Sequence, residues 1–205
     1  ADQFVGSECQ SLVASAFWHL GDSKAARPHA EALLASAEGL RDRYRLVTAL
    51  WFNSLLSACQ GEWQAAKDFN ERGLLVALSD TRLLGARMVM EFDSGDAIQG
   101  QIYLEQLLEA LRILSPEPRY DHAAAALMIP VAARITGAVD QLHMAESAAA
   151  TALAVSTNPL VTKFARLGLG SIAVLRGDVE AATQRYVPLG SASGTYLNIR
   201  GHLCL

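Results

Sequence analysis

The sequence predicts an all-α fold in which helical hairpins stack into a right-handed α-α superhelix, a solenoid of about five helix-turn-helix repeats. Leu, Ala, Glu, Gln and Arg, which are strong helix formers, dominate nearly the whole chain. A glycine followed by an acidic residue recurs about every 40 residues, a period typical of helical-repeat proteins. Apolar residues recur three and four positions apart, the spacing of one helix face, as in Leu104, Leu107, Leu108 and Leu111.

The glycine–acid pairs indicate the turn inside each hairpin. Glycine adopts the left-handed conformation that closes a helix, and an acid beside it suits the positive N-terminus of the next helix. Five positions after most of these glycines stands a small residue, which lets the two helices approach closely. A hairpin of this size cannot bury its apolar face alone, so we expect the copies to stack. The series is Gly21-Asp22, Gly61-Glu62, Gly95-Asp96, Gly137 with its acid delayed to Asp140, and Gly177-Asp178.

Three further breaks interrupt the helical pattern in addition to these turns. They are SPEPR (115–119), STNPL (156–160) and the loop LGSASG (189–194). Pro28 and Pro130 lie inside predicted helices, and we expect them to kink or shorten those helices. The predicted helices span about 3–19, 23–38, 42–59, 63–78, 80–94, 97–114, 120–135, 139–155, 161–175 and 179–188.

We expect residues 1–205 to form a single repeat domain that is a fragment of a longer chain. Residue 1 is Ala rather than Met, and the end GHLCL stops inside an apolar pattern. The unfinished last repeat would expose apolar side chains, which favours a homodimer. Those side chains are Leu197, Ile199, Leu203 and Leu205. The predicted repeats span about 3–38, 42–78, 80–114, 120–155 and 161–188, with the start of a sixth at 195–205.

The glycines and small residues of the turns resemble the tetratricopeptide-type (TPR-like) helical repeat, which has a Gly near the end of its first helix and a small residue early in its second. The matching pairs are Gly21/Ala26, Gly61/Ala66, Gly95/Gly100 and Gly177/Ala182. Segments 95–111, 126–137 and 168–182 also resemble the repeat regions of large bacterial LuxR-type transcriptional regulators and related ATPase or nucleotide-cyclase signalling proteins. This resemblance implies a cytoplasmic, non-enzymatic sensor or interaction scaffold for transcription regulation or signal transduction.

Composition excludes several classes of protein. With 51% hydrophobic and 19% charged residues, the chain is not intrinsically disordered. The net charge of −4 shows no basic excess, so we expect no direct nucleic-acid binding, and the cluster RDRYR (41–45) is interpreted as a solvated helix start. No unbroken apolar stretch reaches 18 residues, so we expect no membrane span. Cys9, Cys59 and Cys204 are odd in number and far apart, which predicts reduced, buried thiols.

No pattern in the sequence indicates catalysis, a cofactor or a metal, so the prediction is that the protein is not an enzyme. The segment GLGSIA (168–173) fits a loose dinucleotide-binding pattern but follows no predicted strand, which favours close helix packing through Gly168 or Gly170. The histidines are scattered over different repeats and are expected to be surface or half-buried polar residues. They are His19, His29, His122, His143 and His202.

The TPR-like resemblance implies a concave groove lined by residues of the first helix of each repeat. An aromatic groove of mixed charge would suit a protein or peptide segment. Two alternatives stay open: the aromatic side chains pack in the core, or the chain binds a small-molecule effector through polar groups such as Asp93 and Arg134. The candidate groove residues are Glu8, Trp18, His19, Trp51, Arg82, Phe92, Asp93, Arg134 and Phe164.

Overall fold

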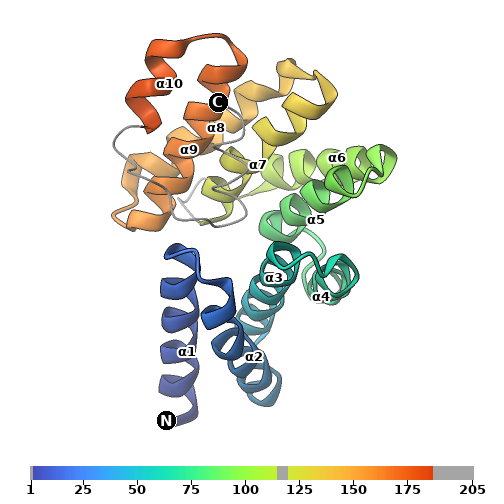
Figure 1. Ribbon diagram of the computed structural model, residues 1–205, viewed down its shortest axis with the longest axis vertical. Coiled ribbons are helices and arrows are strands. Elements are labelled where there is room, and N and C mark those ends of the chain that lie inside the picture. The colour runs from blue at the N-terminus through green and yellow to red at the C-terminus, as the bar shows by residue number, and fades with distance from the viewer. Residues whose placement is uncertain (1, 115–119, 187–205) are drawn as a thin grey trace. The chain divides into compact units, whose positions relative to one another are not determined.

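A computed structural model describes residues 2–114 and 120–186. These residues form ten α-helices and one short 3-10 helix, and they contain no strand (Figure 1). The all-α prediction is therefore confirmed for this part of the chain. The predicted sixth repeat, with its proposed dimer surface, lies outside the described residues, as do Cys204 and His202.

The helix boundaries follow the predicted ones within three residues. One difference lies after Gly137, where a 3-10 helix precedes α8. The helices are α1 (Asp2–His19), α2 (Ser23–Leu40), α3 (Arg43–Cys59), α4 (Trp63–Val76), α5 (Thr81–Asp93), α6 (Ala97–Ile113), α7 (Tyr120–Thr136), η1 (Val139–Gln141), α8 (Leu142–Val155), α9 (Pro159–Leu175) and α10 (Val179–Tyr186).

Two compact units divide the described residues, one ending at Leu78 and the other beginning at Ser79. In the first unit, α1 packs on α2, α2 on α3 and α3 on α4. In the second, α5–α6, α7–α8 and α9–α10 form hairpins, and α7 also packs on α5 and α9. Such packing between neighbours is compatible with a helical repeat. The single domain and the superhelix of five repeats stay predictions.

All five glycines of the repeated turn adopt the left-handed conformation, with φ between 74° and 87°. At the turn after α5, the backbone N–H of Asp96 donates to the carbonyl of Glu91, which closes that helix. The Asp96 carboxylate then accepts from the backbone N–H of Gln99 at 3.0 Å and caps α6. Asp22 and Asp178 cap α2 and α10 in the same way.

Glu62 departs from this pattern. It occupies the position before α4 but its side chain makes no capping hydrogen bond. Its carboxylate lies 2.7 Å from the Arg27 guanidinium of α2 instead. The extra methylene of glutamate carries the charge past the helix end, so this copy of the turn joins two hairpins rather than capping its own helix.

Small residues bring the paired helices together, as expected. A Cβ on Gly100 would lie 2.7 Å from the Phe92 ring, so α6 packs directly over α5. A Cβ on Gly168 would lie 2.2 Å from the carbonyl oxygen of Ala126, which puts the backbones of α9 and α7 in contact. The segment GLGSIA therefore allows close packing of helices, which is the interpretation that the sequence favoured.

Two prolines and two cysteines depart from the expectations drawn from the sequence. Pro28 and Pro130 do not shorten their helices, since α2 and α7 run through them, and the expected kinks stay predictions. Cys9 is exposed rather than buried, and Cys59 is half-buried. No helix among the described residues is long and apolar enough to cross a bilayer.

The close crossing of α9 and α7 predicts a strong asymmetry between two glycine substitutions. Gly168→Ala should lower the free energy of unfolding by about 1–3 kcal/mol, because the new methyl meets backbone that cannot move aside. Gly39→Ala, in α2 with open space around it, should raise that free energy by about 0.5–1 kcal/mol. Urea unfolding followed by circular dichroism measures both, and equal effects would contradict the crossing.

The capping role of the acid in the turn predicts a second asymmetry. Asp96→Ala should lower the free energy of unfolding by about 1 kcal/mol, because the Gln99 N–H loses its acceptor. Asp96→Asn keeps an acceptor oxygen and should stay within about 0.5 kcal/mol of the wild type. Thermal and urea unfolding of the two variants check this, and an equal loss in both would point to charge rather than capping.

Candidate functional site

The nine candidate groove residues differ widely in exposure. Glu8 and Arg134 are exposed, Asp93 is half-buried, and the side chain of His19 lies outside the described residues. The remaining five are buried: Trp18, Trp51, Arg82, Phe92 and Phe164. A buried side chain offers little surface to a partner. For the aromatic residues, the structure therefore agrees with the alternative in which they pack in the core. Partner binding by the nine residues stays a prediction.

The buried aromatics of the first unit pack on one another. The Trp18 and Phe52 rings are 5.7 Å apart and tilted by 60°. The Trp51 and Phe52 rings are 6.0 Å apart and nearly perpendicular. Both pairs have the tilted geometry that aromatic quadrupoles favour, so Phe52 joins the tryptophans of α1 and α3.

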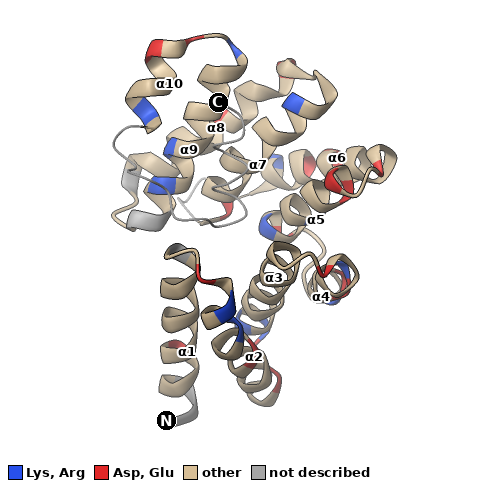
Figure 2. Ribbon diagram, in the orientation of Figure 1, with Lys and Arg blue, Asp and Glu red and all other residues tan. Residues whose placement is uncertain are grey.

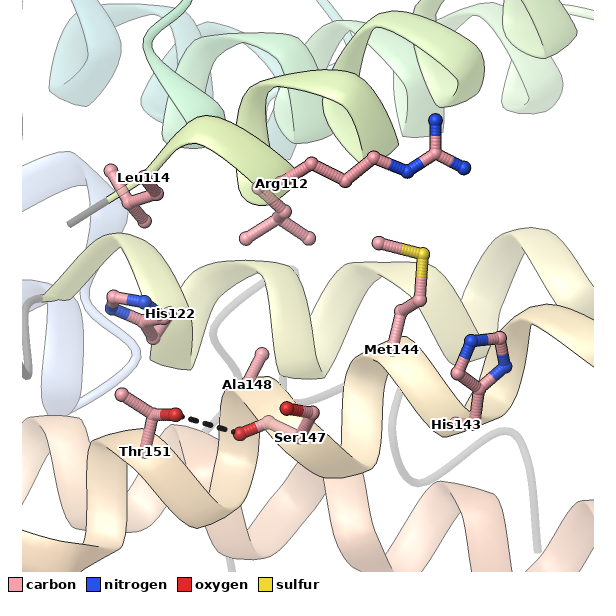
Figure 3. A pocket seen from close by; sticks show the side chains of 9 residues that line it. Arg112, Leu114, His122, His143, Met144, Ser147, Ala148 and Thr151 are labelled. Carbon is pink, nitrogen blue, oxygen red and sulfur yellow. Dashed lines mark hydrogen bonds between the residues drawn. The ribbon is translucent and has the colours of Figure 1, made fainter. Parts of the chain in front are cut away.

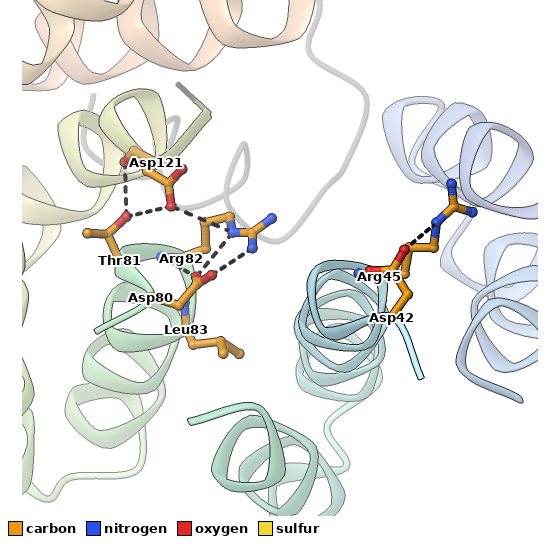
Figure 4. A network of polar contacts seen from close by, with 7 residues as sticks. All are labelled: Asp42, Arg45, Asp80, Thr81, Arg82, Leu83 and Asp121. Atoms are coloured by element: carbon orange, nitrogen blue, oxygen red, sulfur yellow. Dashed lines mark hydrogen bonds and ion pairs between the residues drawn. The ribbon is translucent and has the colours of Figure 1, made fainter. Parts of the chain in front are cut away.

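Arg82 is held in a polar network at the start of α5 (Figure 4). Its Nε and Nη2 donate to the two carboxylate oxygens of Asp80 at 3.1 and 2.6 Å. Asp121 at the start of α7 lies 3.9 Å from Nε and accepts from the Thr81 hydroxyl at 3.2 Å. Burial of the neighbouring Tyr120 raises the pKa of its phenol above the ordinary value. Arg82 therefore joins the starts of two helices.

A pocket of about 330 Å³ lies in the second unit between α6, α7 and α8 (Figure 3). His122 is buried in its wall, so the expectation that every histidine is at least half-exposed is wrong here. Arg112 pairs with Glu109 at 2.9 Å, and the Thr151 hydroxyl donates to the Ser147 carbonyl at 3.0 Å. The pocket is lined by Leu111, Arg112, Leu114, His122, His143, Met144, Ser147, Ala148 and Thr151.

Sequence reasoning missed this pocket because the groove carried over from the resemblance uses first-helix positions alone. The α8 residues that line it do share a spacing of three and four positions, namely Met144, Ser147, Ala148 and Thr151. That spacing marks a common helix face. It does not tell which helices meet that face.

A second, smaller pocket of about 160 Å³ lies in the first unit between α1, α2 and α3. Glu8, one of the candidate groove residues, lies in its wall. Arg45 also lines it and donates to Glu8 at 2.5 Å and to Asp42 at 3.0 Å. The pocket is lined by Ser7, Glu8, Ser11, Leu33, Tyr44, Arg45 and Thr48.

In the basic cluster 41–45, Arg41, Arg43 and Tyr44 are exposed, as the solvated helix-start interpretation expects, whereas Arg45 is buried. Arg41 ends α2 with a left-handed φ of 55°, and Asp42 caps α3 by accepting from the Arg45 N–H. Arg45 is ion-paired with Glu8 and Asp42. Figure 2 shows basic and acidic residues interspersed along the helices.

Among residues 2–114 and 120–186, no group of three or more His, Cys, Asp or Glu side chains is arranged to hold a metal ion. Comparison of the chain with known protein families, with curated proteins and with solved structures finds no match.

The burial of Arg82 predicts that it acts through stability. Arg82→Leu should lower the free energy of unfolding by about 3 kcal/mol or more, because the Asp80 carboxylate, whose side chain is only 10% exposed, is left without its guanidinium partner. Arg134→Leu, at an exposed candidate position, should change it by about 0.5 kcal/mol or less. Urea unfolding of both variants tests this, and unchanged stability of Arg82→Leu would return Arg82 to the list of binding residues.

Proposed function

We propose that the chain is a non-enzymatic module for protein–protein interaction, acting as a regulatory scaffold that captures a protein segment. The observation that carries the proposal is the pocket between α6, α7 and α8. It lies where two successive hairpins meet and combines apolar side chains with histidines, hydroxyls and an arginine. Such mixed walls suit the anchor side chains of a partner segment, whose apolar part is buried while its polar part is hydrogen-bonded.

The TPR-like resemblance supports the regulatory part of the proposal. The glycine–acid turns and small residues that carry it also stand at matching places of the folded hairpins, as at Gly95 and Gly100. We infer from the resemblance that the module is the sensor or interaction segment of a bacterial transcriptional or signalling regulator. Direct nucleic-acid contact and membrane insertion are not part of the proposal.

A small-molecule effector is the second candidate ligand for the same pocket. The volume of about 330 Å³ falls at the lower end of the range of about 300–1,000 Å³ for ligand pockets. Polar groups from three helices, Arg112, His122 and Ser147, reach its wall. A compact metabolite with polar groups on several sides would fit such a site.

A pair of bulky substitutions on α8 tests the pocket. Ser147→Trp places an indole at the pocket wall, so we expect it to reduce partner capture at least about tenfold by occupying the space of an anchor side chain. Ala150→Trp is the matched control, since Ala150 is exposed on the same helix and does not line the pocket. Affinity capture with each variant, with quantification of each retained protein, is the measurement.

A partner retained by the wild type and by Ala150→Trp but lost by Ser147→Trp supports the interaction module. A rise in melting temperature with a metabolite, lost in Ser147→Trp alone, favours the effector, because a ligand that binds only the folded state stabilises it. Equal behaviour of the two variants in both assays would reject this pocket as the binding site.

A further inference from the structure

We propose that a second copy of this chain docks on the outer face of α1, so that two chains form a symmetric dimer through antiparallel α1 helices. The face is an exposed apolar stripe, which we name the α1 stripe. The inference is separate from the α6–α7–α8 pocket and goes beyond the proposed function. The α1 stripe consists of Val5, Cys9, Leu12, Val13, Ala16 and, directly after the helix, Leu20.

Only one side of α1 is covered by the first unit. The helix lies at the edge of that unit and packs on α2 (Figure 1). Ala14 and Trp18, one helical turn apart, are buried and mark the covered side. The α1 stripe lies on the opposite side, where 60% of Val5, 68% of Leu12 and 72% of Leu20 is accessible to solvent. A contiguous exposed apolar surface of this kind marks a protein–protein contact.

The equivalent face of α3 is a packing face. It lies 40 residues further on, at the distance between the Gly21 and Gly61 turns. There Ala49 belongs to an apolar cluster with Leu33 of α2, and the Phe52 ring meets Trp18 of α1. The α3 residues at the positions of the stripe that lie within the helix are all buried, namely Arg45, Ala49, Phe52, Asn53 and Leu56. The α1 stripe is therefore a packing face that the first unit leaves uncovered.

The stripe lacks the polar groups with which α3 holds α2. The Asn53 side chain donates to the carbonyl of Ala30 in α2 at 3.0 Å, and the Gln60 side chain donates to a second α2 carbonyl at 3.4 Å. Val13 and Leu20 stand at the equivalent positions of the stripe and have no side-chain donor. The hydrogen bonds between α3 and α2 thus have no counterpart here, which favours an occupant whose own face is wholly apolar.

Charge favours a second copy as that occupant. None of the six side chains of the α1 stripe is charged. Glu8, at the edge of the stripe, is paired with Arg45 of its own chain at 2.5 Å. Two copies of the stripe can therefore meet without like-charge repulsion and without burying an unpaired charge, which would be costly.

The side chains along the stripe follow a twofold symmetric order. From the midpoint between Leu12 and Val13, each direction gives a large, a small and a large side chain. A twofold axis at this midpoint sets two antiparallel helices so that Cys9 of one copy faces Ala16 of the other. The small residues let the helix axes approach closely, and the large ones pack on either side of them. Such a self-complementary contact is the commonest arrangement in homodimers.

The length of the stripe sets the expected affinity. Residues 5–20 span about 24 Å of a helix that is about 10 Å wide. One such strip on each copy buries an area near or below about 1,200 Å², the low end for specific interfaces. We therefore expect a reversible dimer with a dissociation constant of about 1–100 μM.

Sedimentation equilibrium of the full chain between about 1 and 500 μM is the first test, and we expect a monomer–dimer equilibrium. Leu12→Glu places two like charges beside the twofold axis and should weaken the dimer at least about tenfold. Ile98→Glu is the matched control, because Ile98 is 75% exposed in α6, outside the stripe. This control should change the dissociation constant by about twofold or less. Circular dichroism checks that both variants are folded.

A disulfide trap tests the antiparallel register. Ala16→Cys places a thiol opposite Cys9 of the second copy, so mild oxidation with diamide should give a covalent dimer on a non-reducing gel. Ala35→Cys, at an exposed position of α2, should give little. The wild type should also give little, because its two Cys9 residues would lie about 10 Å apart along the helices, beyond the Cα separation of about 7 Å that a disulfide spans.

The proposal is overturned if the wild type stays monomeric at every concentration, which would leave the stripe to another occupant. A dimer that Leu12→Glu weakens no more than Ile98→Glu does also overturns it, since the contact then lies elsewhere, as on the predicted sixth repeat. Equal cross-linking of Ala16→Cys and Ala35→Cys contradicts the antiparallel pairing. Ser147→Trp should dimerise as the wild type does, so failure of this surface and failure of the α6–α7–α8 pocket are distinguished.

Discussion

The described structure depends on one turn, repeated five times, in which a left-handed glycine ends a helix before the next one begins. At Gly95 the reversal satisfies the last carbonyls of α5, and the adjacent Asp96 then satisfies the first N–H groups of α6. Both helix ends are thus completed within a few residues, without help from distant parts of the chain. Each hairpin can therefore form locally, and its apolar faces are left to be buried against neighbours.

Packing between neighbouring helices buries most of the aromatic residues that were expected to line the candidate groove. Where α6 approaches α5 through Gly100, the Phe92 ring is covered by backbone. Trp18 and Trp51 are likewise held within the first unit, through the ring of Phe52. The repeat resemblance places these aromatic side chains on a binding surface. In this chain they pack in the core instead. Their large apolar area makes core packing the favourable outcome.

The two pockets differ in the polar groups that line them. The α6–α7–α8 pocket mixes histidine, hydroxyl and apolar walls, whereas the α1–α2–α3 pocket centres on Arg45 between two carboxylates. The two charged side chains that line the second pocket, Glu8 and Arg45, are paired with each other. Glu8 is a candidate groove residue from the sequence and also lines this pocket.

The sequence by itself determined the helices and the five turns, and the helix ends to within three residues, because helix propensity, the three-and-four spacing and the glycine–acid pair all act over a few neighbouring residues. Gly21, Gly61 and Gly177 could be assigned without any knowledge of their surroundings. The tertiary structure alone decided that Arg82 braces two helix starts, that His122 is buried and that Ser7 and Arg45 line the same cavity. Those outcomes depend on which faces of distant helices meet, and no local spacing encodes that pairing.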